Sequence, residues 1–67
     1  MTIEIGKKYK IYFSENNINN KTIHVLAIVD EDQVVYKWWS KRKDRWIYVV
    51  DDMMWFDTIS DNIRKAR

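Results

Sequence analysis

The sequence predicts a mainly β protein, formed by one small, strongly bent antiparallel sheet or barrel of four to five strands with a short C-terminal helix. Three observations predict this class. Apolar and polar residues alternate with a period of two from residue 2 to residue 50, and this is the period of a half-buried strand. Polar turns of only a few residues separate the alternating stretches, and such short connections join antiparallel neighbours. A sustained helical period is absent before the C-terminal tail.

Length and composition indicate a single domain. A chain of 67 residues is too short for two domains and buries only about 60% of its unfolded surface. Large side chains must therefore fill the core, and 46% of the residues are hydrophobic and 15% aromatic. We expect residues 1–56 to form a small β-barrel domain, and residues 57–67 to add a polar helix or tail to the same domain.

The first half of the chain predicts two strands and a loop. Residues 2–5 and 8–13 predict a first strand region that Gly6 interrupts. The asparagine-rich segment 14–20 predicts a loop, because asparagine tolerates left-handed backbone conformations. Residues 22–29 predict the next strand. The side chains that we expect on the core face of these strands are Tyr9, Ile11, Phe13, Ile23, Val25, Ala27 and Val29.

Residues 33–39 and 45–50 predict a central hairpin after the acidic turn 30–33. Successive side chains of a strand point to opposite faces, so Trp38 and Trp39 must lie on opposite sides and the core can accept only one of them. We therefore expect at least one tryptophan or tyrosine of the hairpin to be partly exposed. In the first strand, one face carries Val35, Lys37 and Trp39 and the other Val34, Tyr36 and Trp38. In the second strand, Trp46, Tyr48 and Val50 share one face and Ile47 and Val49 the other.

The pattern changes after Val50. The pair Asp51 and Asp52 predicts a turn or a helix N-cap, which we favour over paired acid–base carboxylates. The apolar segment 53–56 predicts a one-turn helix that inserts Met54, Trp55 or Phe56 into the open end of the sheet. In the tail, Ile59 and Ile63 have the spacing of one helical face, and we expect a short helix there.

These elements together resemble a small β-barrel of the Src-homology-3 type. The resemblance rests on Gly6, Lys7, Lys8 and Tyr9 before the first long strand, on the strand 25–30, on residues 34–36, and on residues 46–49 before the segment 53–56. It covers roughly residues 5 to 56. The same order of elements is similar to that of short bacterial and phage proteins of unassigned function. The resemblance implies the barrel fold.

The residue types argue against a catalytic, metal or cofactor site. His24 is the single histidine, so no histidine cluster or triad can form, and we expect it on the surface. The acidic residues 30–32 lack the spacing of a calcium loop. The single glycine, Gly6, excludes a glycine-rich phosphate loop. We therefore predict a protein that is not an enzyme and uses no metal or cofactor.

The chain has none of the sequence features of a membrane or secreted protein. No apolar run approaches the ~20 residues that span a bilayer. The N-terminus carries Glu4 and lacks the apolar centre of a signal peptide. The absence of cysteine fits a reducing compartment. We expect a cytoplasmic protein without a membrane partner, located in the host cytoplasm if a phage encodes it.

The hairpin is the predicted contact region because it concentrates aromatic and basic residues. Aromatic side chains and arginine dominate interface hot spots, and we favour a protein as partner, with Arg42 and Arg45 pairing with its carboxylates. The alternative is single-stranded nucleic acid, with bases stacked on the aromatic rings and with the phosphates contacted by Lys37, Lys41, Arg42, Lys43 and Arg45. A homodimer would use the same surface. The composition is typical of phage and mobile-element inhibitors or adaptors. The predicted contact residues are Trp38, Trp39, Lys41, Arg42, Lys43, Arg45, Trp46 and Tyr48.

Overall fold

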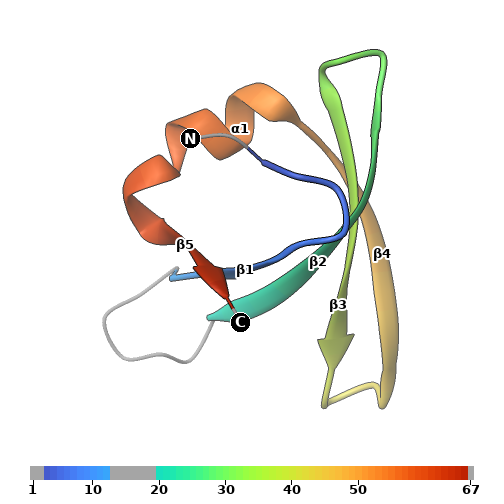
Figure 1. The fold of residues 1–67 in the computed structure, drawn as a ribbon. Helices are drawn as coiled ribbons and strands as arrows, with labels where there is room; N and C mark the ends of the chain where they lie inside the picture. The colour runs from blue at the N-terminus through green and yellow to red at the C-terminus, as the bar shows by residue number, and fades with distance from the viewer. Residues whose placement is uncertain (1–2, 13–19, 67) are drawn as a thin grey trace.

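The computed structural model describes residues 3–12 and 20–66, and it confirms a mainly β fold. One five-stranded antiparallel sheet has the strand order β4-β3-β2-β1-β5. The sheet is strongly bent, with β1 and β5 running across the direction of β3 and β4 (Figure 1). The sheet is not closed, because β4 and β5 are its two edges. The elements are β1 (Lys8–Ile11), β2 (Lys21–Val29), β3 (Gln33–Ser40), β4 (Arg45–Asp52), α1 (Met53–Thr58), the 3₁₀ helix η1 (Ser60–Asn62) and β5 (Ile63–Ala66).

The core lies on the concave side of the sheet, on the same side as α1 (Figure 1). Every strand except β4 contributes fully buried side chains, and Phe56 enters from α1 with an exposed fraction of 1%. The ring of Phe56 meets that of Tyr36 edge to face at 5.7 Å between centroids. Trp38, Val49, Met53, Trp55 and Ile59 complete the packing around the core. The buried apolar residues are Ile3, Tyr9, Ile11, Ile23, Val25, Val34, Tyr36, Phe56 and Ile63.

The predicted cap and the one-turn helix after β4 are confirmed. The Asp52 carboxylate caps α1 by accepting a hydrogen bond from the Met54 backbone N–H at 3.3 Å. The backbone N–H of Met53 donates to the carbonyl of Asp32 at 2.7 Å, which ties the start of the helix to the β2–β3 turn. Phe56 is the side chain that enters the core, whereas Met54 is 73% exposed.

The chain after α1 differs from the expected helical tail. The helix ends at Thr58, and the residues that follow form η1 and then β5, which pairs antiparallel with β1. Ile63 lies opposite Ile11 and is fully buried. A strand here buries Ile63 and satisfies the free edge of β1 at the same time, whereas two isoleucines alone would hold a helix only weakly.

A β-bulge in β2 corrects the predicted core face of that strand. Ile23 and Val25 are buried as expected, but the register with β3 shifts between Val25 and Ala27. The extra residue reverses the side-chain alternation. Ala27 and Val29 therefore turn to the outer face, where Val29 is 47% exposed. The inner position passes to Ile28, which lies opposite Val34.

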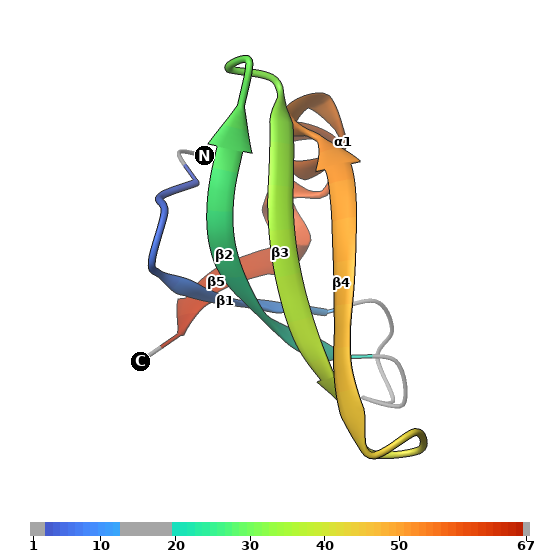
Figure 2. The ribbon, with the colours of Figure 1, turned by 90° about the vertical axis from the view of Figure 1, so that its right-hand side faces the viewer.

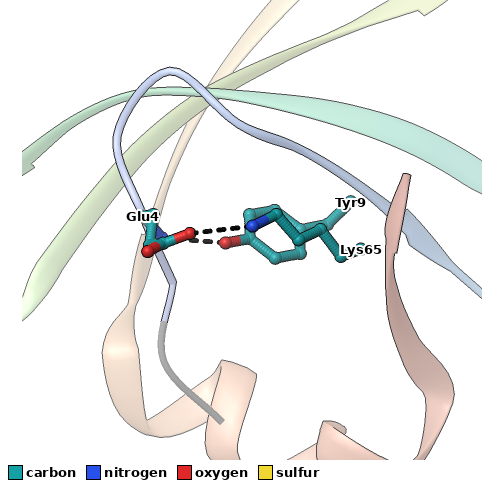
Figure 3. Close-up of polar contacts among 3 residues, drawn as sticks. All are labelled: Glu4, Tyr9 and Lys65. Atoms are coloured by element: carbon teal, nitrogen blue, oxygen red, sulfur yellow. Dashed lines mark hydrogen bonds and ion pairs between the residues drawn. The ribbon is translucent and has the colours of Figure 1, made fainter. Parts of the chain in front are cut away.

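The N-terminal segment is anchored on the sheet without being a strand. Gly6 has a φ of +82°, a conformation that glycine adopts without strain, and its N–H donates to the carbonyl of Val25 at 2.9 Å. The Glu4 backbone N–H donates to the Tyr9 hydroxyl at 2.9 Å, and the Glu4 carboxylate pairs with Lys65 at 3.2 Å (Figure 3). The predicted strand position of Phe13 and most of the predicted loop lie outside the described residues.

Candidate functional site

The structure divides the predicted contact residues between the two faces of the hairpin. Trp38 lies on the inner face, where it packs against the core with the ammonium group of Lys21 3.9 Å from its ring centroid. Trp39 lies on the outer face and is 44% exposed. The prediction that the core accepts only one of the two tryptophans is confirmed. Trp38 is therefore separated from the outer surface that the remaining aromatic residues form.

Trp39, Trp46 and Tyr48 form an aromatic cluster on the outer face of β3 and β4. Trp39 and Trp46 are cross-strand partners, with ring centroids 5.4 Å apart and an interplanar angle of 78°. The ammonium group of Lys37 lies 4.3 Å from the Trp46 ring centroid, and the edge of His24 meets the same ring at 5.0 Å. Tyr48 is 64% exposed. Trp46 is thus packed among neighbours, whereas Tyr48 and Trp39 present ring surface to solvent.

An aliphatic strip continues the outer face toward the β2–β3 turn. Val35 pairs with Val50 on β4 and with Ala27 on β2. Val29 and Val50 are 47% and 58% exposed. The strip exists because the β2 bulge turns Ala27 and Val29 outward. Sequence analysis missed it on β2, since an uninterrupted alternation places both of these residues in the core.

A row of nitrogen-bearing side chains crosses the outer face beside the aromatic cluster. Lys8 of β1 lies opposite His24 of β2, and His24 lies opposite Lys37 of β3. Lys10 and Arg64 are paired in the same way on the same face. Burial lowers the pKa of His24 from its usual value of 6.5, and the charges of Lys8 and Lys37 lower it further. His24 therefore lies between two cationic side chains on this face.

Sequence analysis named Lys37 as a phosphate contact of the nucleic-acid alternative, but it missed the row that Lys37 forms with Lys8 and His24. The alternation places Lys8 and Lys10 on the face of their strand that points away from the core, and this pattern indicated that both lysines are exposed on one face. Their neighbours, however, come from β2, β3 and β5, and the order of strands is not readable from alternation. Arg64 was expected in a helix. The ion pair in the described parts of the chain, between Lys65 and Glu4, involves none of these cations.

The basic residues of the β3–β4 turn lie at the end of the sheet far from α1 (Figure 2). The backbone N–H of Lys43 donates to the hydroxyl of the buried Ser40 at 3.2 Å, and Asp44 adopts a φ of +53°. The turn geometry therefore depends on Ser40 and on the backbone. The cationic side chains, Lys41, Arg42, Lys43 and Arg45, are all exposed.

Asp51 and Asp52 both have structural partners. The Tyr36 hydroxyl donates a hydrogen bond to the Asp51 carboxylate, and Asp52 caps α1. Burial raises the pKa of Tyr36 well above its usual value near 10, and the hydrogen bond and charge of Asp51 raise it further. Among the described residues, no group of three or more histidine, cysteine, aspartate or glutamate side chains is placed to hold a metal ion.

No family model, curated protein or solved structure matches the chain. The resemblance to the Src-homology-3 type of barrel therefore stays a prediction. In the described part of the chain, neither helix has the length and apolar character needed to cross a membrane.

Proposed function

We propose that this chain is a small non-enzymatic binding protein that recognises a protein partner through the outer face of β2, β3 and β4. One observation carries the proposal: the aromatic cluster and the aliphatic strip are connected along the outer face of β4, where Trp46, Tyr48 and Val50 follow one another, with Lys37 beside them on β3. Four large apolar side chains of this face are exposed: Tyr48 by 64%, Val50 by 58%, Val29 by 47% and Trp39 by 44%. Contiguous exposed apolar side chains on a small protein mark interaction sites more often than isolated ones do.

The arrangement of charge favours a protein with an apolar patch bordered by carboxylates. Interfaces place apolar and aromatic side chains at the centre and polar ones at the rim. Here the apolar surface is bordered by the cations of the β3–β4 turn, among them Arg42 and Arg45. Arginine pairs with carboxylates through two parallel hydrogen bonds, so these residues would orient the partner. We further propose a cytoplasmic location and a role as an inhibitor or adaptor, as the composition predicts.

Affinity capture with matched variants tests the proposal. The baits are the wild type, the double variant Trp39→Ala/Tyr48→Ala, and Met54→Ala as a control that removes a 73% exposed apolar side chain from α1 instead. We expect a protein from the source cells to be enriched by the wild type and by the control, and to be lost from the double variant. The charge variant Arg42→Glu/Arg45→Glu should lose it too while remaining folded by circular dichroism. Equal capture by all baits would reject the outer face as the contact surface.

Single-stranded nucleic acid is a second candidate, favoured by the row formed by Lys8, His24 and Lys37 beside exposed aromatic rings. Stacking on an aromatic side chain contributes about 1–3 kcal/mol per base, and the lysines would contact phosphates. Tryptophan fluorescence, titrated with a short single-stranded oligonucleotide, distinguishes this candidate from the first. Quenching that weakens steeply as salt rises would indicate released counterions. Unchanged fluorescence at low salt would eliminate the nucleic-acid candidate and leave the protein partner.

A further inference from the structure

The free edge of β4 is a second surface, distinct from the outer face. Within the described residues, β4 pairs with β3 on one side and with nothing on the other. Figure 2 shows β4 running along the full height of one side of the sheet. Its pairing with β3 is continuous over eight residues. Natural edge strands are usually protected by proline, a bulge or a central charge, and residues 46–50 contain none of these.

The two ends of β4 carry opposite charge. The strand begins with Arg45, directly after the basic turn, and ends with Asp51 and Asp52. A second copy aligned antiparallel would bring the basic end of each β4 against the acidic end of the other. A parallel alignment would place like charges together. The charge distribution is therefore self-complementary only in the antiparallel sense, which is also the sense that a twofold axis produces.

We propose that two copies of this chain pair through β4 as antiparallel strands with Tyr48 on the twofold axis. Residues opposite each other in an antiparallel pair lie on the same face, so each pair must join two odd-numbered or two even-numbered residues. This register pairs Arg45 with the partner's Asp51. It also places Ile47 opposite the partner's Val49, and Trp46 opposite the partner's Val50. A shift by two residues would place Ile47 opposite the partner's Asp51 or Arg45 opposite the partner's Val49.

The pairing would join the two sheets edge to edge and set both outer faces on the same side. The aromatic clusters of the two copies would then adjoin at Tyr48 and form one larger surface. The inference does not depend on the proposed function, because it concerns the backbone edge of β4 and can be tested with the purified chain alone. Loss of partner binding and loss of dimerisation are measured separately.

Cysteine cross-linking tests the register directly, because the chain contains no cysteine. Residues opposite each other in an antiparallel pair have Cα atoms about 4.5–5.5 Å apart, which lies within the range that a disulfide spans. We expect Tyr48→Cys to form a disulfide-linked dimer on mild oxidation at least tenfold faster than Trp39→Cys. The control residue is exposed on the same face but belongs to β3, away from the edge. Equal rates for the two variants would overturn the proposal.

Paired charges at Tyr48 provide a second test that is specific to the axis. Tyr48→Lys and Tyr48→Glu should each shift the wild-type dimer to a monomer of 8.3 kDa in analytical ultracentrifugation, because like charges would face each other across the axis. An equimolar mixture of the two should regain the dimer mass. Both variants should keep the wild-type circular dichroism spectrum, since Tyr48 is 64% exposed. A monomeric wild type at all concentrations up to the millimolar range, or a monomeric mixture, would overturn the proposal.

Discussion

The inner and outer faces of the β3–β4 hairpin carry similar aromatic side chains but differ in what covers them. Tyr36 on the inner face is 6% exposed, whereas Tyr48 on the outer face is 64% exposed. Tyr36 contacts Phe56 of α1 and donates a hydrogen bond to Asp51. The helix α1, which places Phe56 against the inner face, follows the hairpin in the chain. The difference shows that aromatic content alone does not define the core, because later elements determine which face is buried.

The largest effect should follow from removing the covering side chain with Phe56→Ala. Truncation of a buried phenylalanine costs about 3–5 kcal/mol, and a chain of this size has a free energy of unfolding of roughly 3–10 kcal/mol. We expect urea denaturation to show a protein that is mostly unfolded or close to it. The control Met54→Ala, on the exposed side of the same helix, should change the free energy of unfolding by less than about 0.5 kcal/mol. Equal losses would show that α1 does not cover the inner face.

A smaller effect is expected for Tyr36→Phe, which leaves the Asp51 carboxylate without its hydroxyl donor. Because Asp51 is only partly buried, water can replace part of the lost bond, and we expect a loss of about 1 kcal/mol, the typical net contribution of one hydrogen bond. The matched control on the outer face is Tyr48→Phe, for which we expect almost no change in the free energy of unfolding. Chemical denaturation at neutral pH measures both variants. A comparable loss in Tyr48→Phe would contradict the difference between the two faces.

Comparison of the wild type with Tyr36→Phe also tests how stability depends on alkaline pH. The pKa of Tyr36 is raised in the folded state, so folding favours the neutral phenol. The stability that Tyr36 contributes is therefore fully present below its usual pKa near 10 and is lost as the pH rises toward the raised pKa. We expect the free energy of unfolding of the wild type to fall above pH 10 more steeply than that of Tyr36→Phe. Parallel curves would mean that Tyr36 ionises as freely in the folded state as in the unfolded chain.

Sequence alternation correctly predicted which side chains share a face within each strand of the hairpin, because these strands are continuous and the period of two is uninterrupted. It did not predict which of the two faces is buried. It failed at β2, where the bulge between Val25 and Ala27 reverses the faces without any sign in the apolar pattern. It also failed at β5, where the partner strand is some fifty residues earlier in the chain. Residues 63–66 form a strand instead of a helix because Ile63 is buried opposite Ile11. Local propensity does not encode this contact between distant parts of the chain.

The candidate site shows the same division. Alternation predicted that one of Trp38 and Trp39 is exposed, but it did not show which one, because that depends on the side on which α1 covers the hairpin. The aliphatic strip and the row of Lys8, His24 and Lys37 were not predicted as units, because they depend on the bulge and on the order of strands in the sheet. A surface built from several strands requires tertiary information.

On the outer face, Lys37→Met should have a modest effect on stability. The ammonium group lies over the exposed side of the hairpin at 4.3 Å from the Trp46 ring centroid, and such contacts contribute about 0.5–1 kcal/mol at exposed sites. The methylene groups of methionine retain part of the packing. We therefore expect a loss of less than about 1 kcal/mol by thermal or urea denaturation. A loss as large as that of Phe56→Ala would place Lys37 among the structural determinants of the fold.

The smallest effect concerns His24, whose titration reports the charge of the outer face. Its pKa is lowered in the folded state, first by burial and then by Lys8 and Lys37. The contribution of His24 is therefore fully present above pH 6.5, its usual pKa, and is lost as the pH falls through the lowered value. Because the chain has one histidine, its imidazole proton signals in an NMR titration are unambiguous. We expect a midpoint below 6.5 in the wild type and an upward shift in Lys8→Met and in Lys37→Met, since each variant removes one neighbouring charge. A midpoint at or above 6.5, unmoved by either variant, would mean that the three side chains do not share a positive potential and would remove the observation that favours a polyanion on this face.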